Sequence, residues 1–337
     1  IFGRVPAPWP FFPGLSTPRW TIEGLAIWYE SALTQSGRMR GSYHDMVVRT
    51  AVLEGRFEGI DQASGNSPAW PAGQRPYIYG SQFFQHLVEQ HGPQGVGPFV
   101  EAFANQVVPY RLDAAARSAF GVSFSEAWEG WRRSLEEELA VVRGRVLARA
   151  PLTEAEPVTR NARFALFPRP SPDGQSLAWS QSDGREDSHL VLSDPSGDSR
   201  RHLARIIGRA AFDWTPPGQV IFSQLELEDP YRMWRDLYRA SPQGEVERLT
   251  RGARLDHPSV TPDGREVVAT QMAEGSTRLV VVSLETGNVR SLTELDPEVH
   301  WAFPAVSPDG RWIAAARWSQ GAWFDVVLLD RAVSYTH

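Results

Sequence analysis

One carboxylate in the first part of the chain stands in a setting that could do chemistry. Glu23 lies in the motif Trp-x-x-Glu-Gly-x-Ala (residues 20–26), on a helix that we expect to begin with Thr17 as its N-cap and Pro18 as its first residue. A carboxylate there can ligate a metal ion, or it can be a solvated charge that the helix N-terminus favours. Gly24 favours the functional interpretation, because a glycine inside a helix costs about 1 kcal/mol and implies that another part of the chain approaches closely.

A second segment places tyrosines on a helix that we expect over residues 76–91. It reads Tyr77-Ile-Tyr79-Gly80, followed by Phe83 and Phe84. A tyrosine hydroxyl can donate a hydrogen bond to the oxyanion that forms when a carbonyl group is attacked. Tyr77 and Tyr79 are both candidates for that role, and packing is the alternative for each.

These two segments resemble parts of the gluzincin zinc metallopeptidases, in particular the bacterial branch called peptidase MA-like. In that family the Glu of Trp-x-x-Glu-Gly-x-Ala is the third zinc ligand, so the resemblance implies that role for Glu23. In related aminopeptidases a Tyr three residues before a Gly steadies the oxyanion, and Tyr77 occupies that position. Zinc with three protein ligands keeps a fourth position for water and lowers the pKa of that water towards about 7, which makes hydroxide available to attack a peptide bond.

The chain departs from the family at the other zinc ligands. None of its eight histidines forms a His-x-x-x-His pair, and His86 and His91 are five residues apart, so they do not share a helix face. We therefore expect the His-Glu-x-x-His helix, which carries two ligands and the general base, to lie upstream of Ile1. By itself this chain is expected to be inactive and not to hold the catalytic zinc.

The second half of the chain carries an internal repeat. Four turns of the type Ser/Thr-Pro-Asp-Gly, the second with Pro217 in place of Asp, end in glycines that are 44, 46 and 46 residues apart. Two short apolar runs of strand length follow each turn. The period is typical of four-stranded propeller blades, and the units resemble the WD-like repeats of TolB-type propellers. The second unit has an insert around 225–235, expected to be a surface loop, and the last unit lacks its final strand.

The predicted fold is therefore multidomain, with an α domain followed by an all-β domain. Residues 1–149 are expected to form the helical part of the peptidase MA-like domain, with further helices at 43–54, 94–105, 111–119 and 123–148. Residues 150–333 are expected to form about four blades of a partial β-propeller. Residues 334–337 abandon the repeat pattern, and we interpret them as a non-native tail of a fragment truncated at both ends.

Several other polar residues have ordinary structural interpretations. The turn aspartates Asp173, Asp263 and Asp309 are expected to bond their own backbone. Glu30 shares a helix face with Glu23, and we favour a salt bridge over a role behind the zinc ligand. The remaining candidates are interpreted as a helix cap and surface (His44 and Asp45), as helix packing (His86), and as packing rather than lining of a propeller channel (His257 and His300).

Composition narrows the classes of partner. The net charge of −6 argues against nucleic acid and anionic membranes as main partners, and the absence of cysteine excludes disulfides and thiolate chemistry. The resemblance implies a peptide or protein substrate, a protein partner on the propeller, and export to the bacterial periplasm or cell envelope. The alternative function is a non-catalytic envelope protein whose propeller binds protein partners and whose peptidase-like domain is a relic.

Overall fold

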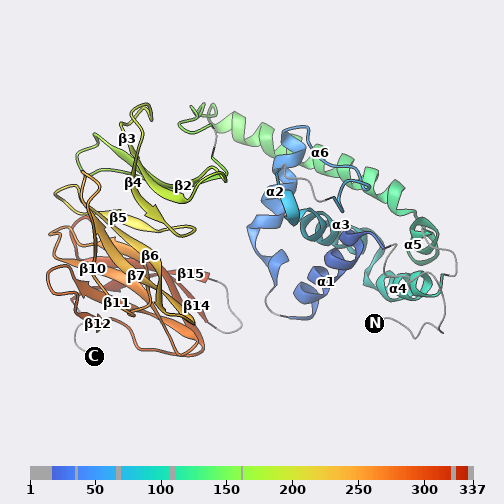
Figure 1. The fold of residues 1–337 in the computed structure, drawn as a ribbon. Helices are drawn as coiled ribbons and strands as arrows, with labels where there is room; N and C mark the ends of the chain where they lie inside the picture. The colour runs from blue at the N-terminus through green and yellow to red at the C-terminus, as the bar shows by residue number, and fades with distance from the viewer. Residues whose placement is uncertain are drawn as a thin grey trace. The chain divides into compact units, whose positions relative to one another are not determined.

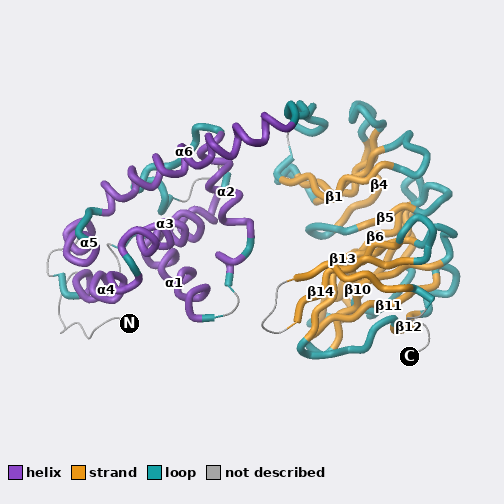
Figure 2. Tube along the Cα trace, turned by 180° about the vertical axis from the view of Figure 1, so that it is seen from behind, coloured by secondary structure: helices purple, strands orange, loops and turns teal. Residues whose placement is uncertain are grey.

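A helical unit and a β unit follow one another along the chain. The structure, a computed structural model, describes residues 17–34, 37–65, 70–106, 111–160, 162–319 and 324–332. The chain divides into two compact units, residues 1–154 and residues 155–337. In the described residues every α-helix lies in the first unit and every strand in the second (Figures 1 and 2). The predicted fold class, α followed by all-β, is confirmed, whereas the predicted tail 334–337 lies outside the described residues.

The helical unit contains six α-helices in its described part. They are α1 (Arg19–Leu33), α2 (Ser42–Leu53), α3 (Arg75–His91), α4 (Val96–Ala104), α5 (Leu112–Phe120) and α6 (Phe124–Arg149). Each falls on a segment that the sequence predicts as helical. The start of α1 differs, because Pro18 has a ψ of 136°, outside the helical range, and therefore occupies the N-cap that was expected of Thr17.

Aromatic rings form the core of the helical unit. Trp20 of α1, Phe83 of α3 and Trp128 of α6 are all buried. Their ring centroids lie 5.6 Å apart for Trp20 and Phe83, and 4.8 Å apart for Phe83 and Trp128. Large aromatic side chains contribute much of the burial energy of a core. This cluster fixes α1 against α3, the two helices that carry Glu23 and Tyr77.

The described part of the β unit forms four antiparallel sheets, each built from strands that are consecutive in the chain. We number these sheets as blades. Blade 1 contains β1 (Phe164–Pro170), β2 (Leu177–Ser182), β3 (Ser188–Ser193) and β4 (Arg201–Ile206); blade 2 contains β5 (Phe212–Trp214), β6 (Val220–Asp229), β7 (Arg232–Ala240) and β8 (Val246–Arg248); blade 3 contains β9 (Leu255–Val260), β10 (Glu266–Ala273), β11 (Ser276–Ser283) and β12 (Val289–Ser291); blade 4 contains β13 (Val299–Val306), β14 (Trp312–Ser319) and β15 (Phe324–Asp330). The arrangement is that of a partial β-propeller, with three strands in the described part of blade 4.

The repeated turn connects the first two strands of each blade. Asp173 accepts hydrogen bonds from the Ser171 hydroxyl at 2.5 Å and from the backbone N–H of Gln175 at 3.0 Å. Asp263 and Asp309 make the same pair of bonds in their own turns. The hydroxyl bond is the main cause of the lowered pKa of all three carboxyl groups. These residues are turn formers, as predicted.

The insert in the second unit is a hairpin and not the surface loop expected from the sequence. β6 and β7 pair along their length, with Leu225 opposite Arg235 and Glu226 opposite Trp234. The alternation of apolar and charged residues there is compatible with a two-sided strand, and cross-strand pairs stabilise it. The insert therefore lengthens the two middle strands of blade 2.

The first strands of blades 1, 3 and 4 share a kink. Phe167, His257 and Phe303 have positive φ values of 58°, 51° and 50°. Each precedes a proline, and the pairing register with the second strand shifts at each place. The ring of His257 lies 4.0 Å from that of Phe303, and the ring of His300 lies 5.3 Å from that of Trp318. Both histidines pack against aromatic rings, which confirms the interpretation preferred from the sequence.

Candidate active site

Two glycines allow α1 and α3 to touch. A Cβ atom built on Gly24 would lie 2.3 Å from the carbonyl carbon of Gly80, and one built on Gly80 would lie 2.0 Å from the carbonyl oxygen of Trp20. Backbone cannot move out of the way as the end of a flexible side chain can. The close approach that Gly24 indicated in the sequence is therefore present, and its partner is Gly80.

This contact brings the two predicted site residues together. Glu23 is next to Gly24 in α1, and Tyr77 lies about one turn before Gly80 in α3. The Tyr77 hydroxyl donates a hydrogen bond of 3.3 Å to Glu23 Oε1, across 54 positions of the sequence. The Glu23 side chain is 32% exposed, so it can be reached from solvent. A carboxylate offers about four acceptor sites, so one bond to Tyr77 leaves capacity for a further ligand.

Charged residues surround the pair on α1 and on the 3₁₀ turn Arg38–Arg40. Arg19 lies 3.8 Å from Glu23, one helical turn away. Arg38 stands over the Tyr77 ring at 5.8 Å and donates a hydrogen bond of 2.9 Å to Glu30. Glu30 thus forms the salt bridge that the sequence favoured. No sequence pattern indicated Arg38, because its contacts with Tyr77 and Glu30 are made only in the folded structure.

Tyr79, the second tyrosine considered for the oxyanion, belongs to the core. It is fully buried, and its ring stacks on that of Trp128 at 6.0 Å. Burial raises the pKa of Tyr79 to about 12. A side chain in this position cannot reach a substrate, so Tyr77 is the better candidate.

His44 and His86 each contact a neighbouring side chain of the helical unit. His44 was interpreted as a cap and surface residue, but it is buried, and its Nδ1 lies 3.1 Å from the Ser81 hydroxyl. Burial and the nearby Arg38 lower its pKa, while Glu30 opposes them. Asp45 is at the surface, paired with Arg49 at 2.9 Å. His86 packs at 6.3 Å from Trp131, and burial lowers its pKa, as helix packing predicts.

The described residues offer one side chain at this place, Glu23, that could ligate a metal ion. Within them, Glu23 belongs to no group of three side chains that could share a metal ion. Zinc needs three protein ligands in a catalytic site. The Glu23–Tyr77 pair fits part of such a site, and the described residues do not complete it.

The described residues define a class of protein: a helical unit with a paired carboxylate and tyrosine, joined in one chain to propeller blades. The sequence matches no protein-family model, and no curated protein matches it. Among solved structures, TolB from Acinetobacter baumannii is 22% identical, with 50% of this chain and 41% of that chain covered and a TM-score of 0.43. A putative TolB from Agrobacterium tumefaciens is also 22% identical, with 50% and 64% covered and a TM-score of 0.43.

A puromycin-hydrolyzing peptidase from Mycobacterium tuberculosis is 18% identical, with 53% of this chain and 29% of that chain covered and a TM-score of 0.41. The match spans less than two thirds of each of these three proteins. Similarity at this level carries no argument about activity.

Proposed function

We propose that this chain carries part of the active site of a zinc metallopeptidase that hydrolyses peptide bonds, with a propeller that binds substrate or a protein partner. In this proposal Glu23 is one of three zinc ligands. The two histidines and the general base come from a His-Glu-x-x-His helix of a longer protein. Tyr77 donates its hydroxyl hydrogen to the developing oxyanion.

The observation that carries the proposal is the hydrogen bond between Tyr77 and Glu23. The resemblance to gluzincins assigns one role to each residue, and the two roles require neighbouring positions. The residues lie far apart in the sequence, yet their side chains meet at 3.3 Å. The contact between Gly24 and Gly80 explains why this meeting is possible.

Each residue has a defined task in the proposed reaction. The Glu23 carboxylate contributes negative charge and an oxygen ligand. The metal, when bound, supplies a water of lowered pKa as the nucleophile. The Tyr77 hydroxyl, released from Glu23, stabilises charge that is present in the transition state and absent in the substrate. Arg38 over the Tyr77 ring restricts the orientation of that ring.

The test is the Glu23→Gln substitution in the full-length protein, with zinc content and peptide turnover measured beside wild type. The substitution keeps size and shape but removes the charge, so turnover should fall to background and zinc content should fall by about one ion per chain. Glu89→Gln, the same chemical change at an exposed position of α3, is the control and should leave both unchanged. Full zinc and full activity in Glu23→Gln would exclude the gluzincin assignment. A wild-type protein without zinc or turnover would favour the non-catalytic envelope protein.

Export to the bacterial periplasm or cell envelope belongs to the same proposal. Across the described residues, none of the helices has the length and apolar character needed to cross a membrane. Fractionation of cells that make the full-length protein tests the location directly. Recovery in the cytoplasmic fraction would contradict it.

A further inference from the structure

The first blade holds a cluster of metal-ligating side chains that the proposed function does not use. Glu186 precedes β3, His189 lies on β3 and His202 on β4. Their ligand atoms all lie within 4.8 Å of one another. In the described part of the chain no other group of three or more His, Cys, Asp and Glu side chains comes this close.

The pairing of β3 with β4 brings the two histidines together. Val191 is opposite His202, and the register shifts between Leu190 and Val191. Since side chains alternate along a strand, His189 points to the same face as Val191, diagonally across from His202. The two imidazole rings stack at 3.9 Å with an angle of 10° between their planes.

The cluster combines two imidazoles, of His189 and His202, with the carboxylate of Glu186. Burial and the neighbouring His202 lower the pKa of His189. Neutral imidazole is the form that ligates metals. Glu186 adds a negative charge 3.6 Å from His202.

We propose that Glu186, His189 and His202 form a binding site for a divalent transition-metal ion, with zinc as the ion that this ligand set fits best. Two imidazoles and one carboxylate are a known zinc combination, and three protein ligands leave one position open. The side chains of His202 and Glu186 are 49% and 57% exposed, so the His202 ring and the Glu186 carboxylate have room to turn towards an ion held by His189.

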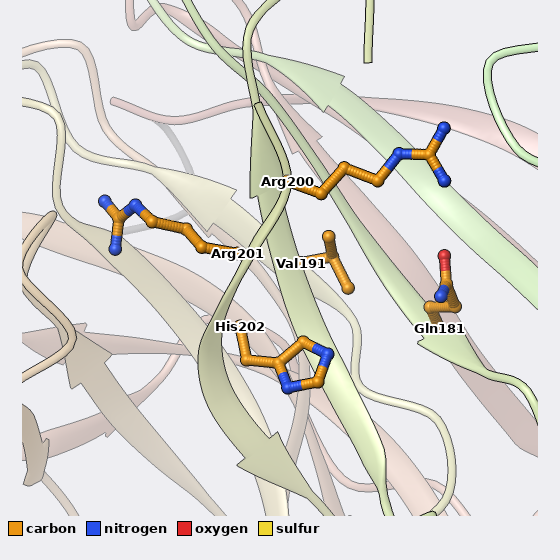
Figure 3. Close-up of a pocket in the computed structure, with 5 residues that line it drawn as sticks. All are labelled: Gln181, Val191, Arg200, Arg201 and His202. Atoms are coloured by element: carbon orange, nitrogen blue, oxygen red, sulfur yellow. The ribbon is translucent and has the colours of Figure 1, made fainter. Parts of the chain in front are cut away.

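A hollow lies beside His202, one of the three proposed ligands. Gln181, Val191, Arg200 and Arg201 line this hollow with His202, and its volume is about 300 Å³ (Figure 3). Figure 3 shows Val191 between Gln181 and His202. Arg200 donates hydrogen bonds to the carbonyl oxygens of Gly197 and Val158.

The test is zinc binding to this whole chain, measured by equilibrium dialysis and by the zinc-dependent rise of the unfolding midpoint. Wild type should bind about one zinc ion per chain, and zinc should raise the midpoint because it binds the folded state. His189→Ala and His202→Ala should each weaken binding at least about tenfold, since even residues behind the ligands cost that much. Glu186→Gln should also weaken it.

Two controls separate this site from others. His300→Ala removes a histidine that packs on Trp318 in blade 4 and should leave binding unchanged. Glu23→Gln should also leave it unchanged, so this result is independent of the proposed peptidase site. The proposal is overturned if wild type binds no zinc, or if the double variant His189→Ala/His202→Ala binds it as wild type does. The midpoint without zinc shows that each variant is folded.

Discussion

At the scale of single residues, the helix places the two candidate tyrosines in different surroundings. Tyr77 and Tyr79 are two positions apart on α3, about 200° around the helix axis. Tyr79 therefore faces the core with Trp128, while Tyr77 faces Glu23 of α1. The resemblance pointed to Tyr77 and Tyr79 was the alternative; of the two, only Tyr77 places its hydroxyl beside Glu23.

Tyr77→Phe in the full-length protein should lower peptide turnover by about 10²–10³-fold, because one donor to the oxyanion is lost. Zinc content and KM should change little, since the donor acts mainly in the transition state. Tyr79→Phe should leave turnover unchanged and change the free energy of unfolding by only about 1 kcal/mol, because the ring that stacks on Trp128 is kept and one buried hydroxyl is lost. Steady-state kinetics and urea unfolding check both. If Tyr79→Phe loses turnover while Tyr77→Phe keeps the turnover of wild type, the choice of Tyr77 is wrong.

Sequence reasoning succeeded where the cause of structure is local. The turn of Ser171 to Gly174 is formed by bonds within a few residues, so its motif predicts it. It failed where the partner is distant or depends on strand register. His189 and His202 meet because the register of β3 and β4 shifts between them, and no sequence pattern specifies that shift. His44 was assigned to the surface because Ser81, its partner, lies 37 residues away.

At the scale of elements, the approach of α1 to α3 depends on two missing side chains. Gly80→Ala should destabilise the helical unit by about 1–3 kcal/mol or more, because the new Cβ atom meets the Trp20 carbonyl oxygen. Gly130→Ala is the matched control, because a Cβ atom there meets nothing within 4 Å. Since Gly130 lies within α6, alanine should stabilise it by about 0.5–1 kcal/mol. Urea unfolding followed by circular dichroism measures both, and equal effects of the two substitutions would contradict the helix contact.

Blade 2 depends on one buried carboxylate that the sequence did not single out. Asp236 of β7 is fully buried. It accepts hydrogen bonds from Arg248 at 2.7 Å, Thr250 Oγ1 at 2.9 Å, and the backbone N–H groups of Gly252 and Ala253 at 2.8 and 2.9 Å. These bonds join β7 to the end of β8 and to the segment that leads into blade 3. Asp236 is therefore a central polar contact between successive blades.

At the scale of the whole molecule, the two units have separate cores. Each hydrophobic cluster of the described residues draws its members from one unit only. We expect two unfolding transitions that respond to different substitutions. Asp236→Asn should lower the free energy of unfolding of the propeller unit by about 3–5 kcal/mol, because it breaks a buried ion pair. The unfolding transition of the helical unit should not change.

Gly80→Ala should destabilise the helical unit and leave the unfolding transition of the propeller unit unchanged. Hydrogen exchange in urea, measured on peptides from each unit, separates the two transitions. Glu247→Gln is the control for Asp236→Asn, because its exposed pair with Arg239 contributes less than about 1 kcal/mol. A single transition that both substitutions lower equally would show that the units fold as one.

The kinked first strands of the blades have a consequence for the behaviour of the protein at high concentration. β1, β9 and β13 are each at the edge of a sheet, and an edge strand with a regular row of free N–H groups can recruit a strand from another molecule. Pro168, Pro258 and Pro304 have no N–H to offer, and the positive φ of the residue before each turns the strand out of line. These three edges are therefore poor templates for intermolecular β-pairing, which protects the repeated blades from aggregation with one another.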